Sequence, residues 1–106
     1  MFLKEDKIME NEVKEIIKAA VEELNEQLDA EKKLEYNPDL RLIGKQSSIE
    51  SMDFVTLVTI IEELVSDRLN KEIRVVSDKA FSRERSPFYS LGSLTDFVVE
   101  LVKEAD

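Results

Sequence analysis

Three serines and two acidic residues stand directly before a long apolar run in this 106-residue chain. The stretch reads Ser47-Ser48-Ile49-Glu50-Ser51-Met52-Asp53 and continues into Phe54-Val55-Thr56-Leu57-Val58. A serine in such a position often caps a helix, because its oxygen accepts hydrogen bonds from the backbone N–H groups of the first turn. The alternative is a covalent attachment point, since a serine hydroxyl is also a site of modification.

Histidine and cysteine are both absent from the chain. A Ser-His-Asp triad is therefore impossible, and so are a catalytic thiol, a disulfide framework and a thiolate metal site. Lysine and carboxylate bases remain, but no pattern of residues points to them. We expect a protein that is not an enzyme, with no catalytic residues and no metal site.

The chain is acidic, with 15 basic and 24 acidic residues and a net charge of −9. This charge disfavours nucleic acids and anionic membrane surfaces, and it favours protein partners with basic patches. No apolar run approaches the roughly 20 residues that span a bilayer. The segment Met1–Lys7 lacks the apolar core of a signal peptide. We expect a cytoplasmic protein that forms a single domain over residues 1–106, without insertion into a membrane.

Apolar spacing predicts three main helices. The first runs from about Met9 to Asp29 and the second from about Met52 to Asn70, each with apolar residues three and four apart. The last begins at Ser93, near a capping-box pattern, and ends at about Lys103. Apolar residues on the second helix cover more than one stripe, which predicts a central helix that is contacted on more than one side.

The connections are also informative. The long segment from Ala30 to Glu50 should pack onto the helices, because apolar residues recur through it. The segment 73–76 should be a short extended piece in the core, 77–81 a single helical turn, and 82–87 an exposed polar loop. The fold class is therefore all-α, a small four-helix bundle of three main helices and one short helix. The apolar residues of the long segment are Leu34, Tyr36, Leu40, Leu42 and Ile43.

Acidic residues dominate the second predicted helix, and no basic residue lies between Lys45 and Arg68. Acids late in a helix gain nothing from the helix dipole, so Glu62, Glu63 and Asp67 need another explanation. They form either an ordinary solvated face or a docking surface for basic partners.

The segment Glu50-Ser51-Met52-Asp53, followed by an apolar helix with the pair Glu62-Glu63, resembles the Asp-Ser-Leu-(Asp/Glu) motif of acyl carrier proteins. The resemblance extends over about Glu10 to Lys103 in the order of elements: helix, long loop, serine-headed helix, short helix and final helix. It implies an acyl-carrier-like bundle that is mostly monomeric.

The resemblance implies a cofactor and partners. Ser51 would carry a covalent 4′-phosphopantetheine arm, which a phosphopantetheinyl transferase adds from coenzyme A with magnesium. Acyl groups would be bound to its thiol as thioesters, as in lipid metabolism, and handed between acyl ligases or synthases that have basic docking patches. Glu50 takes the place of an aspartate that helps the transferase hold its metal, and Met52 that of an apolar interface contact. Asp53, Glu62 and Glu63 match acidic docking positions.

An acyl chain would lie along part of the second predicted helix, at Met52 and residues 54–61. Most of these residues are nevertheless expected to be core. There are two departures from the family pattern, and the second alone, by its length and its charge, favours a specialised carrier over one for general fatty acid biosynthesis. Glu50 is one methylene longer than aspartate, and the segment from Ser66 to Gly92 is longer and more basic. The cargo and the loading ligase stay open.

Two other interpretations remain. The first is an acidic helical interaction module that binds a basic protein and leaves Ser51 unmodified. The second is an oligomerising helical domain, which would sediment as a stable dimer, whereas a carrier is expected to be a monomer.

Overall fold

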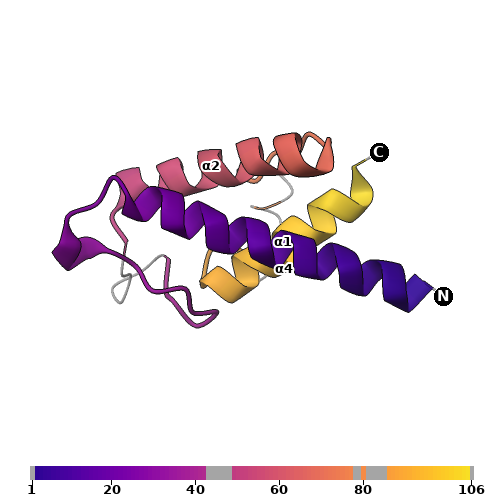
Figure 1. The fold of residues 1–106 in the computed structure, drawn as a ribbon, viewed down its shortest axis with the longest axis horizontal. Coiled ribbons are helices and arrows are strands. Elements are labelled where there is room, and N and C mark those ends of the chain that lie inside the picture. The colour runs from indigo at the N-terminus through magenta and orange to yellow at the C-terminus, as the bar shows by residue number, and fades with distance from the viewer. Residues whose placement is uncertain (1, 43–48, 78–79, 81–85, 106) are drawn as a thin grey trace.

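The computed structural model describes residues 2–42, 49–77, 80 and 86–105. Within these residues the fold is all-helical, as predicted, with a single antiparallel bridge between Arg41 and Ser90 and no strand. Helices α1 and α2 lie side by side and run in opposite directions, while α4 crosses behind α1 (Figure 1). The elements are α1 (Phe2–Asn25), the 3-10 helix η1 (Ala30–Lys32), α2 (Ser51–Leu69) and α4 (Leu91–Glu104).

Helix α1 begins earlier and ends earlier than the predicted range of Met9 to Asp29. No glycine or proline interrupts the charged residues before Met9, so the helix continues back to Phe2. At the other end, the Asn25 side chain donates to the Leu34 carbonyl at 2.8 Å and accepts from the Leu34 N–H at 2.7 Å. These two bonds fix the loop that follows α1 against the end of that helix.

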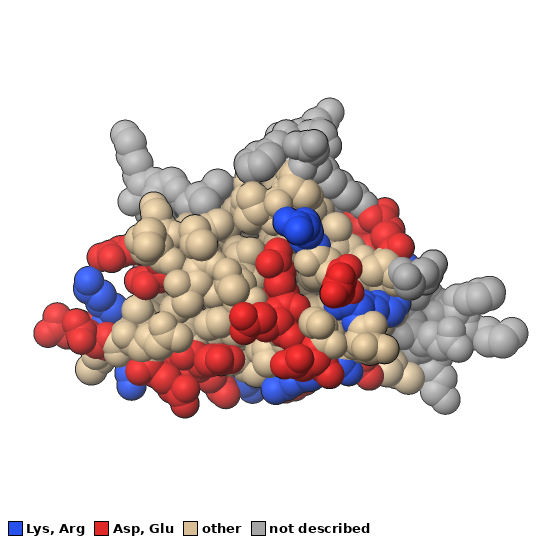
Figure 2. Space-filling view, turned by 90° about the horizontal axis from the view of Figure 1, so that it is seen from above, with Lys and Arg blue, Asp and Glu red and all other residues tan. Residues whose placement is uncertain are grey.

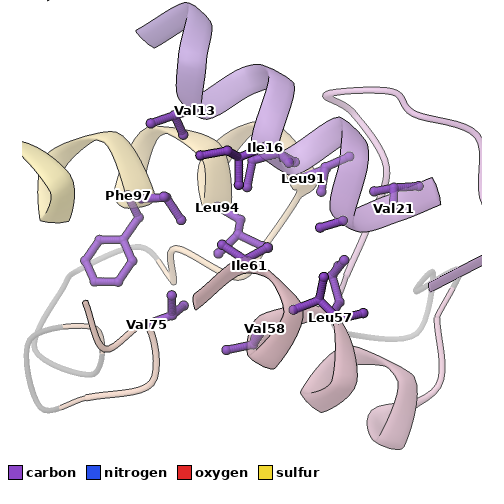
Figure 3. Close-up of a cluster of buried hydrophobic side chains, with 14 of the residues drawn as sticks. Val13, Ile16, Val21, Leu57, Val58, Ile61, Val75, Leu91, Leu94 and Phe97 are labelled. Carbon is purple, nitrogen blue, oxygen red and sulfur yellow. The ribbon is translucent and has the colours of Figure 1, made fainter. Parts of the chain in front are cut away.

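The core lies where the three helices meet. Val13, Ile16 and Val21 of α1 face Leu57, Val58 and Ile61 of α2 and Leu91, Leu94 and Phe97 of α4, with Val75 closing one side (Figure 3). Most of these side chains are fully buried. Burial of an aliphatic or aromatic side chain contributes about 1.5–3 kcal/mol, so this cluster supplies most of the drive to fold.

The helix that packs broadly against both others is α1, and not α2 as predicted. Helix α2 is nevertheless covered on two sides, as expected from its broad apolar set. Its inner side meets α1, while the Phe54 ring packs edge-on against Phe88, with centroids 5.3 Å apart. The helix ends where Asn70 adopts the left-handed conformation (φ 55°), which Asn tolerates better than most residues.

The loop after α1 packs onto the helices, which confirms the prediction for Leu34, Leu40 and Leu42. The side chain of Tyr36 is exposed instead, and Ile43 lies outside the described residues. Backbone bonds tie the loop to the start of α4: Leu91 N–H to the Leu40 carbonyl (2.8 Å), Gly92 N–H to that of Pro38 (2.7 Å) and Leu42 N–H to that of Tyr89 (3.2 Å).

Helix α4 starts at Leu91, with Ser90 and not Ser93 as its N-cap. Ser93 is the reciprocal partner of the capping box: its hydroxyl accepts from the Ser90 N–H at 2.9 Å, and the Ser90 oxygen accepts from the Ser93 N–H at 3.2 Å. The prediction was three residues late because both ends of the box are serine. At the other end, the Lys71 ammonium donates to the carbonyls of Val102 (3.1 Å) and Ala105 (2.9 Å).

The segment 73–76 reaches the core as predicted, because Val75 is fully buried, although Val76 is exposed and the backbone bends from Val75 to Ser77. The predicted helical turn at 77–81 falls largely outside the described residues, as does most of the predicted polar loop at 82–87. Of that turn, the structure gives one helical residue, Ala80, whose N–H donates to the Ser77 carbonyl at 3.0 Å. The described part of the fold therefore has three α-helices.

Candidate functional site

Ser51 is the first residue of α2, and its side chain is exposed. The N-cap is Glu50, in extended conformation, so the interpretation of Ser51 as the N-cap is wrong by one residue. The Glu50 side chain makes no capping hydrogen bond. Among the described residues, no group bonds to the Ser51 hydroxyl, which leaves it open at the start of the helix.

Glu50 forms an ion pair across the chain instead of capping α2. Its Oε1 lies 3.1 Å from the Nζ of Lys32 in η1, and both side chains are exposed. The hydrogen bond to the Glu50 carboxylate, together with its charge, raises the pKa of Lys32 above the ordinary value. The ammonium of Lys32 is the charged partner at neutral pH, and its contribution to the pair is lost as pH rises through that raised pKa.

In its first two turns after Ser51, α2 exposes apolar side chains on its outer side. Met52 is 78% exposed and Val55 58% exposed, and the two lie three residues apart on the helix. The hydroxyls of Thr56 and Thr59 turn back onto the helix and donate to the carbonyls of Met52 and Val55, each at 3.0 Å. This part of the surface therefore offers apolar contact more than hydrogen bonds.

The inner side of α2 leaves little room for an acyl chain. Leu57, Val58, Ile60 and Ile61 are buried in the core, which is half of residues 54–61, where most were expected to be core. Phe54 is half-buried against Phe88. Of the predicted acyl-binding set, Met52 and Val55 are the large apolar side chains that lie open to solvent near Ser51.

The acidic residues of α2 divide into two groups. The half-buried Glu62 carboxylate accepts a hydrogen bond from the Val75 N–H at 2.8 Å, so it holds the segment after α2 against that helix. Glu63 and Asp67 are exposed, and Asp53 is half-buried in the first turn. Figure 2 looks onto this face and shows acidic side chains gathered around uncharged surface, with few basic ones.

Single substitutions of Glu62 and of Glu63 test whether the two acidic residues have different structural roles. Glu62→Ala leaves the part-buried Val75 N–H without its acceptor, so we expect a loss of about 1–2 kcal/mol in the free energy of unfolding. Glu63→Ala, at an exposed neighbouring position, should change it by no more than about 0.5 kcal/mol. Urea denaturation of both variants measures the difference, and equal losses would show that the Glu62–Val75 bond is not a structural tether.

A pocket of about 420 Å³ opens beside the start of α2. Glu50 and Asp53, the two acids that flank Ser51 in the sequence, lie on its wall together with Lys32. Its apolar lining comes from the turn that follows α1, from the long loop and from the residue before Glu50. Those apolar residues are Leu28, Leu34, Leu40 and Ile49.

No family model, curated protein or solved structure matches this chain. The site is therefore interpreted from its own residues. The described part of the chain contains no group of three or more side chains able to hold a metal ion. Within the same residues, no helix combines the length and the apolar character needed to cross a bilayer.

The structure brings Glu50, Ser51, Met52 and Asp53 together on one turn and places Glu62 and Glu63 farther along the same helix. Two parts of the site were not predicted from the sequence. Lys32 lies 18 residues before its partner Glu50, and nothing local marks it. The apolar pocket lining was identified only as loop residues that pack, because the loop path that brings Leu28 near Ile49 depends on tertiary contacts.

Proposed function

We propose that this protein is a carrier of acyl groups, held as thioesters on a 4′-phosphopantetheine arm attached to Ser51. The observation that supports the proposal best is the exposed Ser51 hydroxyl at the start of α2, to which no group of the described residues bonds. A tether needs a reachable oxygen that no structural hydrogen bond occupies. The arm supplies the thiol that this cysteine-free chain lacks.

The first turn of α2 suits a phosphodiester on Ser51. The leading N–H groups of a helix have no partner within it, and the helix dipole favours negative charge at that end. Because the Glu50 carboxylate turns to Lys32, it leaves these donors uncapped. The chain's own contribution is thus to present the hydroxyl and to offer hydrogen-bond donors to the phosphate oxygens.

Docking of partner enzymes would use the outer side of α2. Met52 and Val55 provide exposed apolar contact near Ser51, while Glu63 and Asp67 provide exposed negative charge toward the other end of the helix. An apolar contact with charges beside it matches the usual anatomy of a transient interface, where charge steers the encounter. The partners would be a phosphopantetheinyl transferase and acyl-handling enzymes with basic patches.

The proposal is tested by loading the chain directly. We expect incubation with butyryl-coenzyme A, magnesium and a broad-specificity phosphopantetheinyl transferase to add one acylated arm per chain by intact mass. Hydroxylamine should then remove the butyryl group and leave the arm, because it cleaves thioesters. An unchanged mass with several transferases would count against a carrier.

A second candidate is an acidic interaction module that carries no arm, and the exposure of Glu63 and Asp67 favours it. It predicts that a partner remains bound to Ser51→Ala but is lost when Glu63 and Asp67 are replaced with lysine. These positions are better than Glu62, because Glu62 also holds Val75. The matched control places lysines at the exposed Glu23 and Glu26, on or just after α1.

A further inference from the structure

The pocket beside the start of α2 has Glu50 and Asp53 on its wall, close in sequence to Ser51, and it is open enough to hold a ligand. Its volume of about 420 Å³ falls near the lower end of the range for small-molecule sites. Its apolar lining, Leu28, Leu34, Leu40 and Ile49, is half-buried or buried. The pocket therefore offers a small apolar patch that can shelter a short group.

The core beneath α2 is not an alternative binding site for a group carried near Ser51. Leu57, Ile61 and Val65 are fully buried among the side chains of α1 and α4 (Figure 3). Interiors packed in this way admit an added group only by forcing neighbours apart. A group carried near Ser51 therefore finds its open apolar surface in the pocket and not behind the helix.

The charges on the pocket wall select among short groups. Four carboxylates, from Glu31, Glu35, Glu50 and Asp53, face two ammonium groups, from Lys32 and Lys33. The ion pair with Lys32 neutralises Glu50, which leaves three carboxylates and one lysine. The positive end of the α2 dipole, equivalent to about half a charge, opposes this excess but does not cancel it.

We infer that this pocket binds the cargo of the arm and favours a short acyl group that carries an amine, such as an aminoacyl group. The inference rests on the proposed function, because it takes the cargo to be attached through Ser51. The methylenes of the cargo lie on the apolar lining, and its ammonium is attracted by the excess carboxylates. A cargo that ends in a carboxylate is repelled by the same groups.

Three cargoes that share a two-methylene chain next to the thioester carbonyl and differ at the other end test the selectivity. The chain is loaded by a transferase from β-alanyl-, butyryl- or succinyl-coenzyme A, and intact mass verifies each product. The rate of thioester cleavage by hydroxylamine is then divided by the rate for the same acyl-pantetheine free in solution, which removes the intrinsic reactivity of each thioester. Methyl NMR signals of Leu34 and Ile49 report occupation of the pocket independently of cleavage.

We expect β-alanyl to be protected about two- to fivefold more than butyryl, the effect of a partly exposed ion pair, and succinyl to be protected least. The double variant Glu31→Gln/Glu35→Gln should abolish the preference for β-alanyl. Both residues are exposed and lie outside the Ser51 motif, so folding and loading should be unaffected. The matched control, Glu12→Gln/Glu23→Gln, removes equal charge from exposed positions on α1 and should keep the preference.

Equal protection of the three cargoes, or methyl signals of Leu34 and Ile49 that do not respond to loading, would overturn the inference and leave the carrier proposal standing. Loss of the preference in the α1 control would also overturn it, because the effect would then follow net charge. If no arm is added to Ser51 at all, the proposed function itself fails, and this inference fails with it.

Discussion

Replacement of Ile61 with alanine should lower the free energy of unfolding by about 2–5 kcal/mol, a large part of the stability of a small domain. Ile61 is fully buried near the middle of α2 and points toward Leu94 of α4 (Figure 3). The substitution removes three carbon atoms and leaves a cavity, because the neighbouring helices cannot close around it fully. Urea denaturation followed by circular dichroism measures the loss.

Val55 supplies the matched control on the same helix. Its side chain is 58% exposed, so Val55→Ala should change stability by no more than about 0.5 kcal/mol. If Val55 belongs to the docking surface, the same variant should weaken partner binding while the fold stays intact. A loss for Ile61→Ala as small as that for Val55→Ala would contradict the packing described for the inner side of α2.

Gly92→Ala is the second substitution with a large expected effect. An added Cβ would lie 2.9 Å from the carbonyl oxygen of Pro38, closer than carbon and oxygen atoms approach in folded proteins. The Pro38 carbonyl cannot retreat freely, because it accepts a 2.7 Å hydrogen bond from the Gly92 N–H. Crowding of this kind costs about 1–3 kcal/mol, more than the 0.5–1 kcal/mol that alanine gains over glycine inside a helix. The net result should be a destabilisation of about 1–2 kcal/mol.

The control for Gly92→Ala is Asp96→Ala, at an exposed position on the same helix. There, alanine has the better helix propensity and meets no loop, so stability should stay equal or rise by a few tenths of a kcal/mol. Thermal unfolding of the two variants gives the comparison. If Gly92→Ala is as stable as the parent chain, the close approach of the loop to α4 is not part of the fold.

The sequence was sufficient for features that depend on periodicity. The apolar spacing in α1, α2 and α4 predicts their existence and their inward faces, because a buried stripe repeats every three to four residues. Helix ends were less predictable. Asn25 ends α1 through bonds to Leu34, nine residues on, and Ser90 precedes α4 in a box whose partner, Ser93, is an equally good cap.

The parts of the site set by long-range contacts could not be predicted. Met52 is exposed and Leu57 is buried because α1 covers one face of α2 and not the other. The sequence does not reveal which face is covered, since apolar residues lie on both faces of α2. The structural role of Glu62 depends on where the chain returns at Val75. The pairing of Lys32 with Glu50 depends on the path of the loop that follows α1.

The central claim is that the Ser51 hydroxyl is the tether for the arm, and the most direct measurement is intact mass after treatment with coenzyme A, magnesium and a phosphopantetheinyl transferase. The parent chain and Ser66→Ala, which removes an exposed serine later on α2, should each gain the mass of one phosphopantetheine arm. Ser51→Ala should gain nothing. A parent chain that stays unmodified, or a Ser51→Ala chain that is still modified, would contradict the account.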